Sequence, residues 1–239
     1  NGTRLLQYIT NGDKTYEATV VLGAATVTDD VEGEVISRAD VSAITDAQIE
    51  VEMAKMRGTI MQRPSSVSAV KVDGERAYDR VRAGESVELA AREVTISQLD
   101  IKDVRRIENA IEVDIEVTCS AGTFIRAIAR DCGDALAVGG HLNSLRRTRV
   151  AGFGLDKSIS LTALKAGEFS TLGLVDVART TFSARELALD EVNELSFGRP
   201  LSANPDEAIY AAISGQDLIA LLCNKDGLAK PIAVFAAAN

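Results

Sequence analysis

Residues 111–119 alternate strictly between apolar and polar side chains. The apolar side chains fall on one face of an extended chain and belong to Ile111, Val113, Ile115, Val117 and Cys119. The other face carries acids and a threonine. Alternation with a period of two residues predicts a β-strand that is buried on one side and solvated on the other. The chain is therefore expected to build a sheet with one covered face.

This strand leads into a predicted helix. After a turn at residues 120–122, apolar side chains recur at helical spacing from Ile125 to Leu136. Thr123 is expected to be the N-cap, which places Arg126 in the first turn. The positive end of the helix dipole favours an acid over a cation there by roughly 0.3 to 1 kcal/mol. Arg126 either binds an anion or lies on the solvent face of the helix.

Other segments before residue 161 also read as short strands and helices. Thr45 and Gln48 form a capping box that predicts a helix with Ile49, Met53 and Met56 buried and Gly58 as its end. The remaining predictions are strands at 16–22 and 94–101, a loop at 23–33, an extended segment at 64–72, a turn at 73–74 and a short helix at 76–83 before Gly84. Together they predict an α+β fold with a largely antiparallel sheet.

The character of the chain changes after about residue 161. Residues 172–182 are expected to be a linker, followed by a helix over 183–197 that Gly198 ends. Three short apolar runs then follow, separated by turn-forming residues at 214–217 and 224–227. Residues 183–239 are therefore expected to form a small β domain.

The composition excludes several classes of site. The chain has 239 residues, 46% of them hydrophobic, with three widely spaced cysteines and His141 as its one histidine. A zinc site or a disulfide framework is not expected from this set. A serine or cysteine nucleophile would need His141 as its base. No apolar run approaches the roughly 18 residues of a membrane span, so a cytoplasmic protein is the expectation.

The net charge of −9 argues against a nucleic-acid partner, because phosphate binding normally uses an excess of lysine and arginine. The distribution of charge argues the other way. Residues 63–82 contain five basic side chains and three acids, and residues 119–149 contain five arginines and two acids. Basic patches of this kind either meet RNA or form solvated faces.

Several motifs stand in the order found in one family. They are Lys14-Thr-Tyr-Glu-Ala18, the run from Pro64 through Lys71 and Arg76 to Gly84, the segment from Cys119 to Gly133, and His141-Leu-Asn-Ser-Leu-Arg-Arg-Thr148. From Asn1 to about Leu161 the chain resembles the TruB family of bacterial tRNA pseudouridine synthases, which modify the T-loop uridine of tRNA. The resemblance implies a pseudouridine synthase fold over residues 1–171 and a C-terminal PUA-like domain over 183–239.

One motif of that family is missing. Its catalytic aspartate lies in a Gly-Gly-Thr-Leu-Asp-Pro-type segment that precedes a stretch like Thr-Arg-Leu-Leu-Gln-Tyr-Ile at residues 3–9, and no such segment occurs here. We therefore expect a fragment of a longer enzyme that lacks the nucleophile and is inactive alone.

The resemblance assigns roles to individual residues. Tyr16 matches the tyrosine that packs against the target base, Arg126 the arginine that pairs with the catalytic aspartate, and Leu145 a leucine of the uracil pocket. Contacts to RNA are expected from Asp30, Lys71, Arg76, Arg146 and Arg147. A plain strand tyrosine, a core leucine, a polar turn residue and solvated charges are the structural alternatives. Asp29, Asp30 and Glu32 could instead hold a hard cation, although no calcium-binding loop is present.

The expected activity is isomerisation of U55 by a monomer that binds the T-arm of tRNA and needs no cofactor or metal. Two other classes remain open. One is a module that binds or folds tRNA without chemistry, and the other is a protein-interaction domain, which the acidic charge would suit.

Overall fold

The structure is a computed structural model that describes residues 2–68, 71–72, 74–82, 89–205 and 208–236. The chain forms two compact units, one made of Asn11–Val150 and the other of Asn1–Thr10 with Ala151–Asn239. The boundary at residue 171 that the resemblance implies lies inside the second of these units.

The unit of residues 11–150 is built on an antiparallel sheet with the strand order β9-β1-β8-β7-β4. These strands are β1 (Lys14–Leu22), β4 (Gly58–Gln62), β7 (Arg92–Ile107), β8 (Ala110–Cys119) and β9 (Gly140–Val150). The alternation predicted for residues 111–119 is confirmed, because buried and partly exposed residues alternate along the whole of β8.

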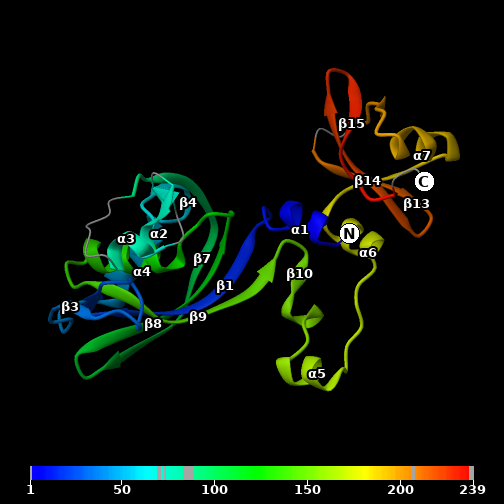
Figure 1. The fold of residues 1–239 in the computed structure, drawn as a ribbon. Coiled ribbons are helices and arrows are strands. Elements are labelled where there is room, and N and C mark those ends of the chain that lie inside the picture. The colour runs from blue at the N-terminus through cyan, green and yellow to red at the C-terminus, as the bar shows by residue number, and fades with distance from the viewer. Residues whose placement is uncertain (1, 69–70, 73, 83–88, 206–207, 237–239) are drawn as a thin grey trace. The chain divides into compact units, whose positions relative to one another are not determined.

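Helices α2 (Asp46–Ala54) and α4 (Ile125–Ala135) lie on one face of this sheet (Figure 1). The hydrophobic core between the helices and the sheet contains apolar residues of β1, β7 and β8 together with Ile49, Met53 and Ile128. The smaller elements are β2 (Ala24–Thr26) paired with β3 (Val35–Arg38), β5 (Lys71–Val72) paired with β6 (Glu75–Arg76), and α3 (Ala77–Arg82). The helices thus cover one face of the sheet, as the pattern of β8 requires.

The two predicted helix starts in this unit turned out differently. Thr45 and Gln48 form the predicted capping box, and α2 ends before Gly58, which opens β4 instead. Thr123 is not the N-cap of α4: the cap is Phe124, which has no side-chain capping bond. The helix begins one residue later than expected, at Ile125, and the Thr123 hydroxyl belongs to the preceding turn, where it donates to the carbonyl of Ser120 at 3.0 Å. Arg126 still lies in the first turn.

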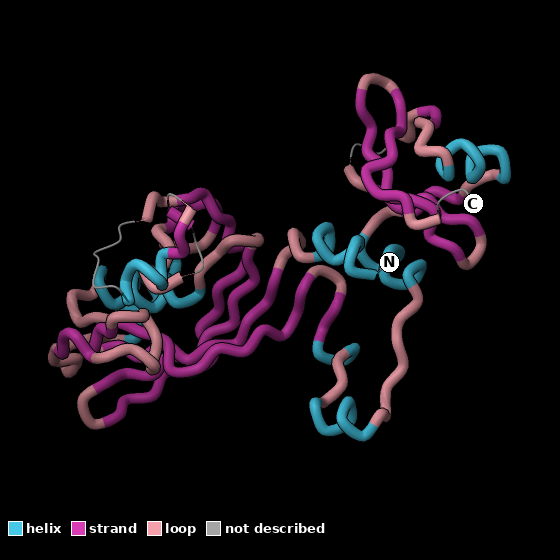
Figure 2. Tube along the Cα trace, viewed as in Figure 1, coloured by secondary structure: helices cyan, strands magenta, loops and turns pink. Residues whose placement is uncertain are grey.

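The second unit contains a five-stranded sheet with the order β11-β13-β14-β15-β12. Its strands are β11 (Ala184–Glu186), β12 (Leu201–Ser202), β13 (Tyr210–Ser214), β14 (Asp217–Lys225) and β15 (Leu228–Val234). Its remaining elements are α1 (Gly2–Ile9), β10 (Phe153–Gly154), a 3-10 turn (Leu155–Lys157), α5 (Leu161–Ala166), α6 (Leu174–Thr181) and α7 (Leu189–Ser196). The three apolar runs are strands, as predicted, and β13, β14 and β15 follow one another as a meander (Figure 2).

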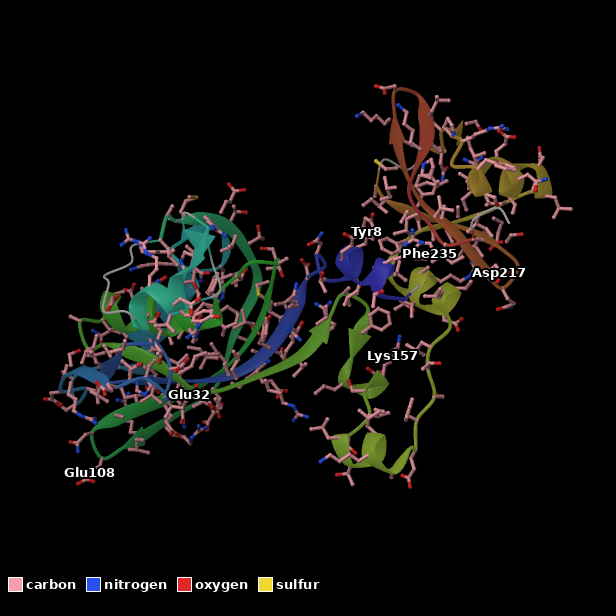
Figure 3. The ribbon with its side chains drawn as sticks, in the orientation of Figure 1. Tyr8, Glu32, Glu108, Lys157, Asp217 and Phe235 are labelled. Atoms are coloured by element: carbon pink, nitrogen blue, oxygen red, sulfur yellow. The ribbon has the colours of Figure 1, made fainter. Side chains whose placement is uncertain are left out.

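Two sequence interpretations in this unit need correction. The segment expected to be a linker contains α6, whose Val175 and Ala178 pack with Leu5 of α1 in a core that also holds Phe235 and Tyr8 (Figure 3). The helix expected over 183–197 begins only at Leu189, because β11 pairs in parallel with β13 and takes up the preceding residues. In the described part of the chain, no helix combines the length and apolar character needed to span a membrane.

Candidate active site

Arg126 is the second residue of α4, and its side chain joins two loops. Nη1 donates to the carbonyl of Thr28 at 2.7 Å and to Oδ2 of Asp30 at 2.9 Å, and Nη2 donates to the carbonyl of Val67 at 2.7 Å. The ion pair is largely shielded, since each of the two side chains is about a quarter exposed (23% and 24%). Of the two alternatives for Arg126, an anion partner or the solvent face, the structure shows an anion partner, Asp30, whereas the pairing with the catalytic aspartate that the resemblance implies stays a prediction.

The carboxylate of Asp30 is fixed on its other side as well. Oδ1 accepts the hydroxyl of Thr28 at 2.5 Å and the backbone N–H of Glu32 at 3.2 Å. The loop is attached to β9, because Val31 N–H donates to the carbonyl of Leu142 and Leu142 N–H donates to that of Asp29. Asp29 has a positive φ of 59°, which aspartate tolerates better than most residues. Asp30 is therefore held in one orientation toward Arg126.

A second ion pair lies one helical turn further along α4. Arg130 contacts Asp29 Oδ2 at 3.3 Å and Asp131 Oδ1 at 2.7 Å, and it donates to the carbonyl of Arg63 at 2.7 Å. Burial raises the pKa of Asp131, and the adjacent Arg130 opposes that shift. Asp29 and Asp30 thus face arginines rather than one another. Among the described residues, no group of three or more potential ligands could hold a metal ion.

Beside the Arg126–Asp30 pair is an open cavity of about 270 Å³. Its wall combines the two charged side chains with Glu32 (Figure 3) and the β9 residues Leu142, Asn143, Ser144 and Leu145. Leu145 is half exposed at 49%, so it is not a core leucine. The cavity thus offers an apolar wall next to a fixed guanidinium.

Tyr16 and Arg147 lie on the same face of the sheet as this cavity. In the register of β1 and β9, Tyr16 is opposite Arg147 and Ala18 is opposite Leu145. Directly opposed residues of an antiparallel pair share a face. Burial raises the pKa of the Tyr16 hydroxyl, while a hydrogen bond with Arg147 acts to lower it. Tyr16 therefore stays protonated at neutral pH with its ring partly covered.

Arg146 lies on the other face. It is opposite Glu17, and both line a second groove of about 490 Å³ with Asp114 and Lys102. On this face Thr19 donates to Asp114 at 2.7 Å and Arg105 forms an ion pair with Asp114. The structure thus places Arg146 on the face opposite Tyr16 and Arg147, although Leu145 borders both the groove and the cavity.

For Lys71 and Arg76, which were also predicted to contact RNA, the structure describes the backbone position only. Lys71 and Arg76 are opposite each other in the β5–β6 pair. Their side chains lie outside the described residues, so their predicted contacts with RNA stay a prediction.

Sequence reasoning missed the residues that hold Arg126 in place. The carbonyls of Thr28 and Val67 and the hydroxyl of Thr28 show no side-chain pattern that could have revealed them. Gln62, which hydrogen-bonds to the backbone of Phe124, also gave no signal. A guanidinium has five N–H groups, and the partners within the described part of the chain use three of those of Arg126. The other two N–H groups have no acceptor among the described residues, and a carboxylate would suit them.

Comparison with known proteins identifies the family. The family model "TruB family pseudouridylate synthase (N terminal domain)" matches residues 1–125. The models "tRNA pseudouridylate synthase B C-terminal domain" and "tRNA Pseudouridine synthase II, C terminal" match residues 126–171 and 182–236.

Curated relatives cover almost the whole chain. The chain is 48% identical to "tRNA pseudouridine synthase B" of Arthrobacter sp. (strain FB24) over 249 residues, which is 99% of this chain and 81% of the relative. It is also 48% identical to the protein of the same name from Mycobacteroides abscessus over 239 residues, which is 99% of this chain and 80% of the relative.

Solved structures share the fold. One titled "Structure of H/ACA RNP bound to a substrate RNA containing 2'-deoxyuridine" has a TM-score of 0.65 at 18% identity, covering 98% of this chain and 69% of that one. "Crystal Structure of a Cbf5-Nop10-Gar1 Complex" has a TM-score of 0.63 at 22% identity, covering 99% and 69%. The fold is therefore that of the pseudouridine synthases, and with the matches above the chain belongs to the TruB family of pseudouridylate synthases.

Proposed function

We propose that this protein is a tRNA pseudouridine synthase that isomerises the T-loop uridine, U55. The relatives that cover nearly the whole chain carry the name tRNA pseudouridine synthase B. The observation that carries the proposal is the Arg126–Asp30 pair at the edge of a cavity with an apolar wall. A fixed cation with two donors that no described residue uses suits a reaction that depends on orienting a carboxylate nucleophile.

The reaction cleaves the N-glycosidic bond of the uridine, turns the base and rejoins it to the ribose through carbon. The base must first leave its stack, which costs a few kcal/mol. In our proposal the base enters the cavity beside Leu145, and Tyr16 packs against it. Arg126 directs its two remaining N–H groups at the nucleophilic aspartate, and Asp30 fixes the guanidinium in that direction. The chemistry needs no cofactor or metal.

The nucleophile itself is not among these residues. The 239 residues contain no Gly-Gly-Thr-Leu-Asp-Pro-type segment. We propose that this stretch of chain alone does not isomerise uridine. Recognition of the T-arm by a monomer, with phosphate contacts from Lys71, Arg76 and Arg147, belongs to the same proposal. Shape and loop recognition of this kind is usual for folded RNA.

Arg126→Ala tests the proposal in the protein as its gene encodes it. Pseudouridine formation is measured on an unmodified tRNA transcript, alongside the Kd for that tRNA. Loss of one aligned donor commonly costs about a hundred- to a thousandfold in rate, so the rate should fall by at least that factor while Kd stays nearly constant. Arg106→Ala is the matched control, because Arg106 also donates to a backbone carbonyl (Ile44) and pairs with an aspartate (Asp46).

A second candidate, for this stretch of chain taken alone, is a tRNA-binding module without chemistry, since these 239 residues contain no such aspartate motif. The same experiment separates the two candidates. If the unsubstituted protein makes no pseudouridine and Arg126→Ala causes only a modest loss of affinity, the module is correct. Undetectable tRNA binding at low salt, where electrostatic contacts are strongest, would exclude both.

A further inference from the structure

Helix α4, which carries Arg126, begins without a side-chain cap of its own. Its N-cap residue Phe124 has no polar side chain, and the neighbouring Thr123 hydroxyl is engaged with Ser120. The first backbone N–H groups of a helix have no partner within the helix, and a buried helix end needs another source of hydrogen bonds. At the start of α4 that source lies on a different element.

Gln62, the last residue of β4, bonds to both the N–H and the carbonyl of Phe124, whose carbonyl also accepts the first helical bond from Ala127. The N–H of Phe124 donates to Oε1 at 2.8 Å, and Nε2 donates to the carbonyl of Phe124 at 3.1 Å. The side chain is only 2% exposed, so water does not compete for these groups. The backbone of Gln62 is opposite Arg92 of β7 in the sheet. A sheet strand therefore holds the first turn of α4 by a two-point clamp.

The residue that Gln62 holds, Phe124, lies two residues before Arg126. The segment that follows Gln62 makes further hydrogen bonds to α4. Beyond Gln62, the carbonyl of Arg63 accepts from Arg130 and the carbonyl of Val67 accepts from Arg126. Any tilt or shift of the first turn would move the guanidinium relative to the Asp30 loop. That loop is anchored separately, through Leu142 of β9.

We propose that Gln62 is a positioning residue for the isomerisation, acting through the backbone of Phe124 to aim Arg126. It does not touch the substrate. A primary amide suits this role because it presents one donor and one acceptor side by side. Glutamate would set an acceptor against the Phe124 carbonyl, and methionine would supply neither bond. The inference rests on the proposed function for its kinetic consequence, although the aim of Arg126 can be observed without activity.

The decisive variant is Gln62→Met, compared with Gln48→Met. Gln48 also bonds its side chain to a helix N-terminus, in the capping box of α2, so the two variants make the same chemical change. A misplacement of about 1 Å can cost on the order of a hundredfold in rate. At saturating tRNA, the single-turnover rate should fall by roughly ten- to a hundredfold in Gln62→Met and stay within about twofold in Gln48→Met. The Kd for tRNA should be unchanged in both.

A readout without catalysis is the NMR signal of the Arg126 side-chain Nε–H, assigned by its loss in Arg126→Ala. It should shift or broaden in Gln62→Met and stay in place in Gln48→Met. An unmoved signal, or a full single-turnover rate, would overturn the role of Gln62. If Gln62→Met does not fold, Gln62→Glu replaces it and should show the same lowered rate and shifted signal. All rates are measured in the protein as its gene encodes it. Inactivity of that unsubstituted protein would refute the proposed function, and the NMR comparison would then decide the positioning role alone.

Discussion

At the scale of single residues, the site depends on how a cation is made stable at the positive end of a helix. The dipole at the start of α4 disfavours Arg126 by roughly 0.3 to 1 kcal/mol. Two backbone carbonyls and the Asp30 carboxylate offset that cost. Bonds from a guanidinium to a carboxylate are stronger than neutral ones. The three acceptors come from two different loops. They therefore fix the orientation of the Arg126 guanidinium as well as compensating its charge.

Asp30→Asn should therefore weaken catalysis more than folding. The amide keeps a neutral acceptor but loses the charge that holds Nη1. Hydrogen bonds to charged groups contribute about 1.5 to 3 kcal/mol, so we expect roughly a ten- to hundredfold lower rate of pseudouridine formation. The control is Asp40→Asn, since among the residues that the structure describes Asp40 bonds only within its own turn, to Ser42. Equal rates for the two variants would contradict the role of Asp30.

Tyr16 gives a prediction about pH. Burial raises the pKa of its hydroxyl above the usual value of about 10. A raised pKa in the folded state means that the stabilising contribution is complete below the unfolded pKa and is lost as pH rises through the folded one. The ultraviolet phenolate signal that disappears in Tyr16→Phe should titrate above pH 10, and the stability difference between the two proteins should change only in that alkaline range. A Tyr16 component that titrates below pH 10 would show that Arg147 outweighs burial.

At the scale of elements, the position of α4 on the sheet depends on small residues. A methyl group built on Gly133 would overlap the backbone of Gly139 and Gly140, and one built on Gly140 would overlap the carbonyl of Ala129. Helix α4 and the start of β9 therefore approach at backbone contact. This approach brings Arg126 and the β9 wall of the cavity into one region.

Gly133→Ala should destabilise this unit although alanine is the better helix former. Overpacking in a filled interior costs about 1 to 3 kcal/mol, which exceeds the roughly 1 kcal/mol gained in helix propensity. The free energy of unfolding from urea titration should fall, whereas Asp134→Ala, at the next and exposed position, should leave it nearly unchanged. A Gly133→Ala protein as stable as the parent would show that the helix can move away from β9.

The sequence predicted those elements that depend on interactions between residues close together in the chain, and it missed those that depend on distant ones. The strand at residues 111–119 and the Thr45 capping box depend on neighbours within a few residues, and both are confirmed. Thr123 was wrongly taken as a cap because α4 begins one residue later, at Ile125, with Phe124 as its N-cap. Residues 184–186 pair with residues 27 positions further along the chain, which local periodicity does not record. Likewise, the family resemblance pointed to Asp30 and Arg126, while their partners Thr28 and Val67 act through backbone atoms that no side-chain pattern marks.

At the scale of the whole molecule, an acidic protein that is proposed to bind RNA needs basic side chains that are not paired with its own carboxylates where the RNA lies. Two of the five arginines in the basic stretch 119–149 do not meet that condition. Arg126 and Arg130 are already paired with Asp29, Asp30 and Asp131. The solvated face of the sheet is a network of ion pairs in which Arg105 meets three acids and Lys102 meets two. Exposed arginines on the cavity face are therefore the candidates for phosphate contacts.

Arg146 and Arg147 allow a direct test, because adjacent residues of one strand carry the same charge to opposite faces. Arg147 is opposite Tyr16, on the side of the cavity, and Arg146 is opposite Glu17, beside the ion-pair network. Each phosphate contact contributes about one unit to the slope of log Kd against log salt. Arg147→Gln should weaken tRNA binding and reduce that slope by about one, whereas Arg146→Gln should leave both unchanged. Equal losses in the two variants would mean that RNA reaches both faces of the sheet, and a loss confined to Arg146→Gln would place the RNA on the face opposite the Arg126 cavity.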